Sequence, residues 1–313
     1  MVNDDQIKAE ISPFAIREGE IKTFDGKDGY VSMNQIVHKI NIGHITDIHF
    51  QILELVNEFE FITSRQLFQM LLIKGFDPKT QDKLNTKLEQ LVKTKILTRY
   101  YFNQEEGKGI YRIYCLEKMG KYLLQSKEIT CNWQQSDNTK PVAMIKKRLA
   151  GNQVLIAYLR KVKAFDEFTV KPAITTKISR KTFKPSGGSV SLTKNSRSIS
   201  FLFEVIRREK DWKSKLEDRM KLYKEFYENF QPMDAGFKAM PQLILVCEDE
   251  KHMAETFKEI ITRKLEINQI NLYYTTDLRQ NSDSLENTLI EFKLDETTNK
   301  YKIKNIDLKL LEK

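Results

Sequence analysis

One stretch of the sequence, residues 79–93, combines side chains suited to binding nucleic acid. Its apolar residues, led by Leu84 and Leu88, recur at spacings of three and four, which predicts a helix with one buried face. On a helical wheel centred on Leu84, the opposite and flanking positions hold Lys79, Asp82, Lys83, Asn85, Thr86, Gln90 and Lys93. Lysines neutralise phosphates, and hydroxyl or amide groups hydrogen-bond base edges. The pattern predicts a helix that reads the major groove of DNA.

Five further residues are candidates for contacts to the DNA backbone. Arg65 and Gln66 lie near the start of the preceding predicted helix, where they would anchor a phosphate. Lys108 lies at the tip of a predicted β-hairpin, and Arg99 and Arg112 lie on its two strands. These side chains add positive charge where a phosphate would pass.

The same helix face has a less specific interpretation. Any exposed helix of a basic protein displays lysines, and a charged face is usually only a solvated face. Asp82 and Glu89 lie on or beside the proposed reading face and weaken its electrostatic case. The order of the elements favours insertion of this helix into the groove. The alternative is that the same fold binds another protein and does not bind DNA.

The predicted elements around these residues occur in the order of a winged helix-turn-helix. Helical periodicity begins at Thr46, a second helix runs from Thr63 to Gly75, and Asp77-Pro78 opens the third. Two β-type runs, 97–102 and 110–115, then flank a polar loop that contains glycine, and a short helix over 117–125 follows. In a winged helix the third helix enters the major groove and the hairpin lies on the backbone. Residues 45–125 are therefore predicted to be a DNA-binding domain.

A second candidate site lies on the predicted strand 200–206. It invites comparison with PD-(D/E)xK nucleases, whose sheet presents two carboxylates that hold a divalent metal and a lysine that helps to activate water. Glu204 would be one carboxylate, but the lysine position holds Ile206, and the preceding extended segment 187–192 contains no aspartate. Arg207 or Lys194 would have to substitute in space. We therefore expect a nuclease-like domain without a complete metal site, in which Glu204 serves the fold or a partner contact.

Other catalytic and metal-binding patterns are absent from the sequence. Cys115, Cys131 and Cys247 are far apart, and the four histidines show no paired spacing, so neither a disulfide framework nor a zinc site is predicted. There is no phosphate-binding glycine loop, no GxSxG and no HExxH. We expect no cofactor and no metal, and a non-catalytic role is favoured over an enzymatic one.

The fold class predicted for the whole chain is α+β, with the winged helix followed by an α/β, restriction-endonuclease-like domain. Residues 1–44 form an N-terminal extension without an assigned role, residues 126–141 a linker that is most mobile over 132–140, and residues 142–313 the α/β domain. The second half alternates strands with helices, which indicates a sheet covered by helices. Its predicted helices are 153–162, 209–230 and 251–264, and its predicted extended segments are 168–174, 189–192, 199–206, 243–247, 270–274, 289–294 and 301–306.

Composition restricts the class of partner. The chain has 52 Lys and Arg against 43 Asp and Glu, a formal charge of +9, which favours a polyanion. No apolar run reaches the roughly 18 residues of a transmembrane helix, and residues 1–11 are too polar for a signal peptide. We expect a cytoplasmic protein that binds double-stranded DNA and no membrane.

The two halves together resemble the replication-relaxation family, winged-helix proteins of plasmids and integrative elements of Gram-positive bacteria. The similarity spans about residues 48–276 and is a pattern more than a set of invariant motifs. It is carried by residues 52–55, 61–67, 84–97, 111–114, Gly120, 203–205, Lys215, Tyr223 and Tyr227. The resemblance implies DNA binding in plasmid replication or in the relaxation step before transfer, with a C-terminal nuclease-like domain that is often degenerate. Glycines and serines replace the family's commoner Pro-Asp signature before Glu204, which argues further against catalysis.

These observations lead to one main hypothesis and two alternatives. The main one is a non-catalytic DNA-binding protein of a mobile element that acts at an origin of replication or transfer and recruits replication or relaxase proteins. The first alternative is a transcriptional regulator of the same element, and the second is a metal-dependent nuclease with a rearranged site around Glu204. A homodimer would suit a palindromic site, although no heptad seam of useful length is present.

Overall fold

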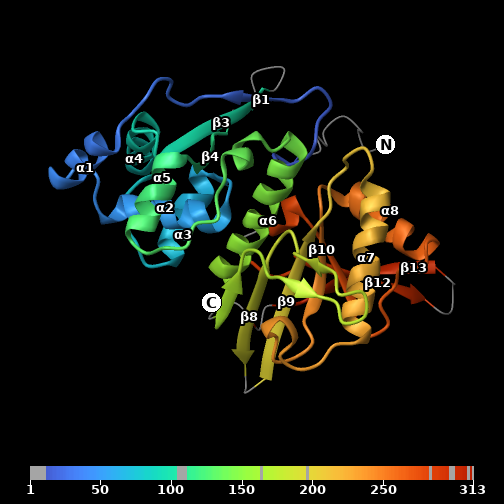
Figure 1. The fold of residues 1–313 in the computed structure, drawn as a ribbon. Helices are drawn as coiled ribbons and strands as arrows, with labels where there is room; N and C mark the ends of the chain where they lie inside the picture. Colours follow the sequence, from blue (N-terminus) through green and yellow to red (C-terminus); the bar gives the residue numbers. More distant parts are fainter. Residues whose placement is uncertain are drawn as a thin grey trace. The chain divides into compact units, whose positions relative to one another are not determined.

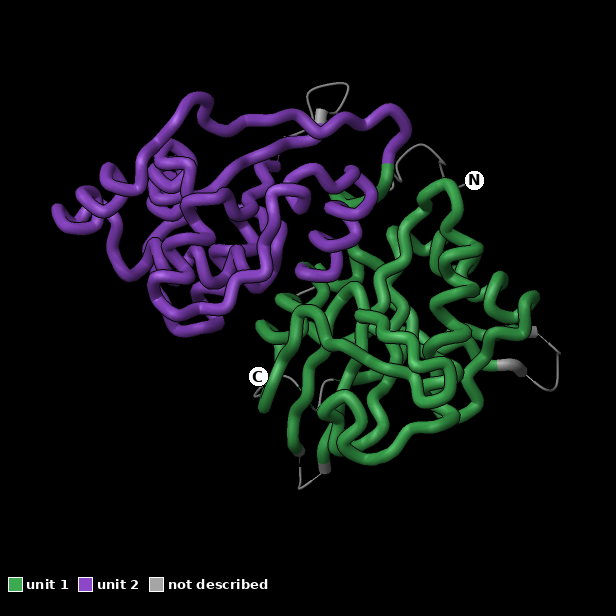
Figure 2. Tube along the Cα trace, viewed as in Figure 1, with its two compact units in different colours: residues 1–16, 153–313 green, residues 17–152 purple. Residues whose placement is uncertain are grey.

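The computed structural model describes residues 12–103, 111–162, 165–194, 197–281, 284–295, 300–308 and 311, and it divides the chain into two compact units. Residues 17–152 form the first, called here the helical unit, and residues 153–313 with the chain before residue 17 form the second, the sheet unit (Figures 1 and 2). The chain passes between them within helix α6 (Val142–Lys161). Both units mix helices with strands, which agrees with the mixed α/β class expected from the sequence.

The helical unit contains the predicted succession of three helices and a strand pair. The helices are α1 (Met33–Asn41), α2 (Asp47–Phe59), α3 (Ser64–Ile73), α4 (Gln81–Lys93) and α5 (Lys118–Ser126). Strands β1 (Ile21–Phe24), β2 (Ile62–Thr63), β3 (Leu97–Asn103) and β4 (Ile113–Leu116) form a four-stranded sheet in the order β1-β3-β4-β2. The predicted hairpin is present as the antiparallel pair β3 and β4, and its tip lies outside the described residues.

Local capping and apolar periodicity explain where these helices lie. Thr46 and Thr63, where the sequence predicts that two helices begin, are the N-caps of α2 and α3, and each makes a reciprocal hydrogen-bond pair with the third residue of its helix. The helix α4 begins later than predicted, at Gln81, because Thr80 supplies its cap while Lys79 adopts a left-handed φ of 66°. Its buried stripe consists, as predicted, of Leu84, Leu88, Leu91 and Val92.

Residues 17–44 of the predicted extension and the whole predicted linker are parts of the helical unit. In the former, β1 pairs antiparallel with β3. In the latter, a 3-10 helix, Gln135–Thr139, holds the buried Asn138, whose side chain donates to the carbonyl of Leu116 at 2.9 Å and accepts from Trp133 Nε1 at 3.2 Å. The unit boundary therefore falls after residue 152 rather than at residue 141. The pattern misled us because polar residues fill this segment, yet they satisfy buried backbone groups.

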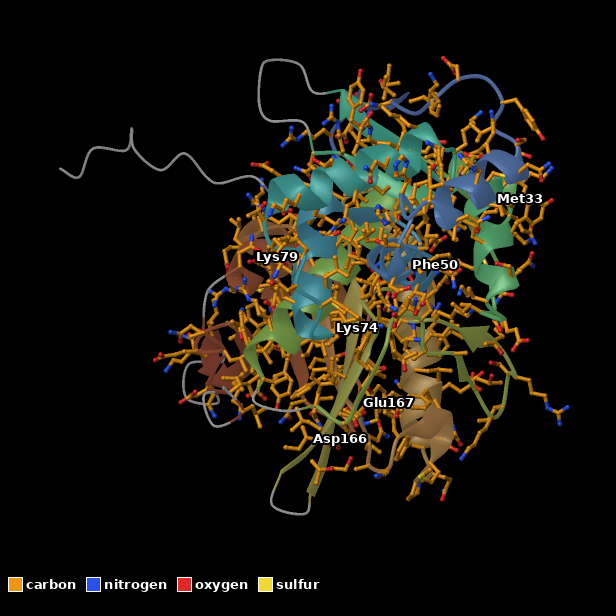
Figure 3. All side chains as sticks on the ribbon, turned by 90° about the vertical axis from the view of Figure 1, so that its left-hand side faces the viewer. Met33, Phe50, Lys74, Lys79, Asp166 and Glu167 are labelled. Carbon is orange, nitrogen blue, oxygen red and sulfur yellow. The ribbon has the colours of Figure 1, made fainter. Side chains whose placement is uncertain are left out.

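The sheet unit is built on seven strands in the order β13-β12-β11-β10-β9-β8-β5. The strands β9, β10 and β11 are parallel, and the outer pairings are antiparallel. Their bounds are β5 (Glu167–Thr169), β8 (Ser189–Lys194), β9 (Arg197–Val205), β10 (Gln242–Cys247), β11 (Leu272–Thr276), β12 (Leu289–Asp295) and β13 (Lys300–Ile306). Figure 3 marks the start of β5 by the side chains of Asp166 and Glu167.

Helices cover this sheet because its strands alternate between two apolar faces. The long helices α7 (Trp212–Glu228) and α8 (Glu250–Thr262) pack on one face (Figure 1), in a core that includes Leu202 of β9. A short helix α9 (Asp277–Gln280) follows β11. On the other face, Tyr158 of α6 packs its ring 4.7 Å from that of Phe203. A separate two-stranded pair, β6 (Ile174–Thr175) and β7 (Thr182–Phe183), replaces part of the extended segment predicted over 168–174.

The glycines before β8 have a structural role. A Cβ on Gly187 would lie 2.6 Å from the Cβ of Phe203, and Gly188 has a φ of 81°. Both join the β9 ladder through their backbones, since Gly187 donates to the carbonyl of Phe203 and the amide of Phe203 donates to Gly188. Close packing of the two strands thus accounts for the glycine pair.

Candidate nucleic-acid interface

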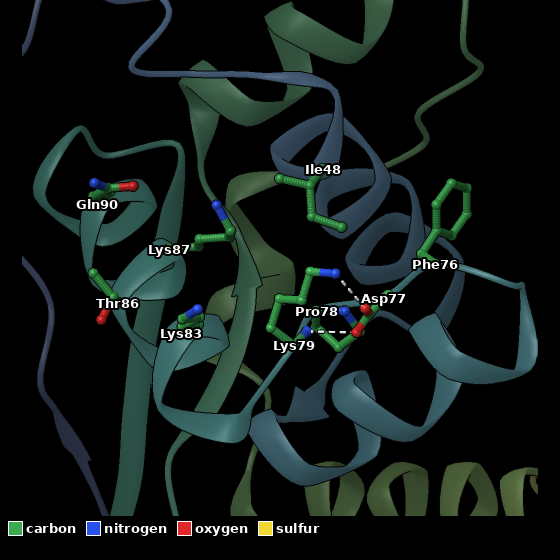
Figure 4. Close-up of a pocket in the computed structure, with 9 residues that line it drawn as sticks. All are labelled: Ile48, Phe76, Asp77, Pro78, Lys79, Lys83, Thr86, Lys87 and Gln90. Carbon is green, nitrogen blue, oxygen red and sulfur yellow. Dashed lines mark hydrogen bonds and ion pairs between the residues drawn. The ribbon is translucent and has the colours of Figure 1, made fainter.

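A hollow of about 540 Å³ lies along the exposed side of α4 in the helical unit (Figure 4). It is lined by Ile48, Phe76, Asp77, Pro78, Lys79, Lys83, Thr86, Lys87 and Gln90. These residues come from the start of α2, the segment between α3 and α4, and α4 itself. Four of the predicted DNA contacts are therefore brought together, namely Lys79, Lys83, Thr86 and Gln90.

The lysines of the hollow differ in whether a nearby carboxylate neutralises their charge. Lys79 projects from the segment before α4 (Figure 3), and both its Nζ and its backbone amide lie 2.7 Å from the Asp77 carboxylate. The hydrogen bond from the Lys79 side chain is the main reason why the pKa of Asp77 lies below its usual value. Among the described residues, neither Lys83 nor Lys87 forms an ion pair. The hollow thus offers two positive charges that no carboxylate neutralises at contact distance.

Gln90 is held in place by a buried histidine. His49 Nδ1 accepts the backbone amide of Thr46 at 3.1 Å, so the ring proton belongs on Nε2, which lies 3.1 Å from Gln90 Oε1. Burial lowers the pKa of His49, which keeps the ring neutral and this tautomer populated. Because the amide oxygen of Gln90 accepts from His49, its NH₂ group remains to donate toward the hollow.

The remaining polar residues of α4 are less well placed to bind a ligand. The hydroxyl of Thr86 donates to the carbonyl of Asp82 at 3.0 Å and keeps its lone pairs for a donor. Asn85 accepts from Gln81 at 3.2 Å, and Lys93 lies 3.9 Å from Glu89. Asn85 and Lys93 are exposed but do not line the hollow.

Gln66 was predicted to contact DNA and is instead buried, with 1% of its surface exposed. Its Nε2 donates to the carbonyl of Leu149 at 2.7 Å, and its Oε1 accepts from the Thr63 amide at 3.1 Å. Both ends of the amide are therefore used within the fold. Arg65, next to it, is exposed and outside the lining of the hollow.

The predicted contacts on the hairpin are also altered by tertiary pairing. Arg99 is only 8% exposed, and its guanidinium lies 2.5 Å from Glu89 and 2.9 Å from Asp25. Arg112 is exposed, and its Nε lies 3.0 Å from the same Asp25 carboxylate. Arg99 is thus a structural residue rather than a phosphate contact, and Glu89 is turned away from the reading face to pair with it. Lys108 lies outside the described residues.

Five residues of the hollow were not among the predicted contacts, namely Ile48, Phe76, Asp77, Pro78 and Lys87. Lys87 follows Lys83 by one helical turn, but on the wheel it lies only about 60° from Leu84, at the flank of the buried stripe. It reaches the hollow because α2 places Ile48 against this flank. The repeat of lysines at i and i+4 was the signal that pointed to it.

Glu204, the nuclease candidate, sits in a closed hydrogen-bond network in the sheet unit. It is 2% exposed, its Oε1 accepts from Ser186 Oγ at 2.9 Å, and its Oε2 accepts from the Tyr223 hydroxyl at 2.9 Å. Arg219 Nε approaches Oε1 at 3.5 Å. Burial, with a smaller contribution from the Glu204 charge, raises the pKa of Tyr223. These contacts tie β9 to α7 and agree with a role in the fold.

Within the described part of the chain, no three His, Cys, Asp or Glu side chains are grouped as a metal site would require. The same part contains no helix long and apolar enough to cross a membrane.

Comparisons with known proteins add little beyond the fold description. No protein-family model and no curated protein matches the chain. Two of the solved structures that it matches are the restriction endonuclease FokI and FokI bound to DNA, at 13% and 12% identity. The alignments cover 73% and 80% of this chain but 41% and 49% of FokI, with a TM-score of 0.27 in both cases. This chain therefore spans less than half of FokI. The resemblance to the replication-relaxation family continues to rest on the residues given above.

Proposed function

We propose that the helical unit is a winged helix that binds double-stranded DNA through the hollow along α4. The observation that carries the proposal is the pair Lys83 and Lys87, which form no ion pair among the described residues and lie beside Gln90, whose amide is oriented by His49. Two available cations and an ordered amide donor at one exposed helix face are what phosphate neutralisation and base recognition require.

The order of the elements supports this use of α4. The helices α2, α3 and α4 precede the antiparallel pair β3 and β4, as in winged helices that place their third helix in the major groove. The stripe from Leu84 to Val92 anchors one side of α4 in the core, so the polar side faces outward as a rigid unit. A rigid helix that presents Thr86 and Gln90 can discriminate bases, because each polar group holds a defined position.

The setting in which this DNA binding operates follows from the resemblance given above. The chain would bind at an origin of replication or transfer of a mobile element and recruit replication or relaxase proteins through its sheet unit. A transcriptional regulator of the same element would use the same DNA-binding face, and the position of its site, over a promoter rather than an origin, separates the two roles. The network around Glu204 supports a non-catalytic sheet unit.

The proposal is tested by selecting bound duplexes from a fragment library of the host element, with and without Mg²⁺ and at two salt concentrations. Enrichment of one origin-proximal fragment, recovered uncut, supports the proposal, and enrichment of a promoter fragment supports the regulator. If no fragment is enriched at low salt, DNA binding is refuted and protein contact becomes the favoured role. Cleavage with Mg²⁺ that is lost in Glu204→Gln, a change that keeps the side chain's shape, would establish the nuclease instead.

A further inference from the structure

One long stretch of the sheet unit carries only positive charge. Residues 168–203 contain seven Lys and Arg and no Asp or Glu, so their formal charge is +7, whereas the formal charge of the whole chain is +9. The pair β6 and β7 lies in this stretch, and four of the seven basic residues, Lys177, Arg180, Lys181 and Lys184, lie in its connecting loop or directly after it. The charge is therefore concentrated on one small hairpin.

The base of this hairpin is fixed in the core. Ile174 on β6 and Phe183 on β7 are buried among the residues of the α7 core, and the Phe183 ring meets that of Tyr223 edge-on at 5.0 Å. The two strands pair through Ile174 with Phe183 and Thr175 with Thr182. A buried base means that the loop between the strands is held at a defined place on the surface.

The tip of the hairpin is also ordered by hydrogen bonds. The amide of Thr176 donates to the carbonyl of Lys181 at 3.0 Å, which closes the loop. The amides of Ile178 and Ser179 donate to a single carboxylate oxygen of Glu225 on α7, at 2.9 and 2.7 Å. Glu225 is thus engaged by the loop backbone, and the loop geometry does not have to be organised when a ligand arrives.

The side chains of the tip project into solvent. Ile178 is 75% exposed, and Arg180, Lys181 and Lys184 are exposed as well. Lys177 pairs with Asp234 at 2.8 Å, but none of the three other cations forms an ion pair within the described residues. The ordered loop therefore presents one apolar side chain beside three cations that no carboxylate of the described residues neutralises at contact distance.

We propose that this hairpin tip is a second DNA contact, separate from the hollow along α4. Arg180, Lys181 and Lys184 bind backbone phosphates, and Ile178 enters the minor groove as an apolar wedge. This inference shares its ligand with the function proposed above but uses different residues in a different unit. An anionic membrane would offer similar chemistry, but one isoleucine contributes only about 1.5–3 kcal/mol on burial, and stable anchoring takes a second strong signal.

The charge contribution is tested with the triple variant Arg180→Ala/Lys181→Ala/Lys184→Ala in the full chain. Its matched control is Lys238→Ala/Lys251→Ala/Lys258→Ala, which removes the same charge from exposed positions of the sheet unit. We expect the hairpin variant to bind a 40-base-pair duplex about 500-fold more weakly in 0.1 M salt if the two proteins converge near 1 M, since three phosphate contacts contribute about 2.7 to the salt slope. Equal affinity of the two triple variants would overturn the proposal. If Lys83→Ala/Lys87→Ala binds DNA as tightly as the parent chain while the hairpin variant binds it more weakly, the α4 proposal fails and this one stands.

Proximity to DNA is tested separately through a cysteine at position 178. The three native cysteines are buried, so Ile178→Cys supplies the accessible thiol for coupling a hydroxyl-radical source. We expect it to cut bound DNA at a defined position, whereas the same reagent at Ile303→Cys on β13, a position that is also well exposed, should not. Absence of cutting from position 178 would overturn the proposal, as would charge-dependent binding of the tip to phosphatidylserine vesicles in place of DNA.

Discussion

Replacing both available lysines of the α4 hollow, in Lys83→Ala/Lys87→Ala, should weaken DNA binding by a calculable amount. Each contact between a lysine and a duplex phosphate lowers the slope of log K against log salt by about 0.9, so two contacts contribute about 1.8. If the variant and the parent chain converge near 1 M salt, the difference at 0.1 M is about 60-fold, or about 2.4 kcal/mol. Alanine has the highest helix propensity, so α4 should be retained.

The measurement is fluorescence anisotropy with a labelled duplex at four or five salt concentrations between 0.05 and 0.3 M. Lys118→Ala/Lys127→Ala removes the same charge from exposed positions at the two ends of α5, outside the hollow, and serves as the control. We expect the control to keep the parent slope within experimental scatter. Should both double variants lose slope equally, the effect is one of net charge, and the assignment of the interface to α4 is refuted.

Three further changes test single contacts. Asp77→Asn should free the lysine that it pairs with, steepen the salt slope by up to about 0.9 and tighten DNA binding up to about eightfold, measured by the same anisotropy assay. Burial lowers the pKa of His252 to about 3, so the stability that its neutral ring contributes is complete above about pH 6.5 and lost as the pH falls toward 3. Urea unfolding followed by Trp212 fluorescence in a Trp133→Phe background should show about 2 kcal/mol lost between pH 7 and pH 5, and His252→Phe should abolish that part of the loss. Gln66→Ala should lower the free energy of unfolding by about 1–3 kcal/mol, because it leaves a buried carbonyl and a helix cap without their hydrogen bonds. The loss would be seen as a lower urea midpoint, while the DNA affinity of the folded protein stays unchanged. A loss of affinity without a loss of stability would mean that the side chain does reach DNA.

Much of the candidate interface was predictable because it depends on groups close together in the chain. The stripe of Leu84 and Leu88 and the cap at Thr63 involve interactions across three or four residues, which a sequence shows directly. The same periodicity placed Lys83 and Gln90 on one outward face, and the structure brings both to the hollow. The start of α4 was predicted less well, since Asp77 followed by Pro78 and Thr80 are both acceptable N-cap signals and only one residue can supply the cap.

Periodicity, capping and charge counts are local or additive properties, so the succession of elements, their buried faces and the excess of positive charge can be predicted from the sequence. Which polar groups are available to a ligand depends on tertiary contacts. Arg99 is neutralised by Asp25, 74 residues earlier, and Gln66 donates its side-chain amide to the carbonyl of Leu149, 83 residues later. The hydrogen bond from His49 orients Gln90 across 41 residues. A buried hydrogen bond or ion pair forms between groups that the fold brings within about 3 Å, and no local pattern records which distant group that will be.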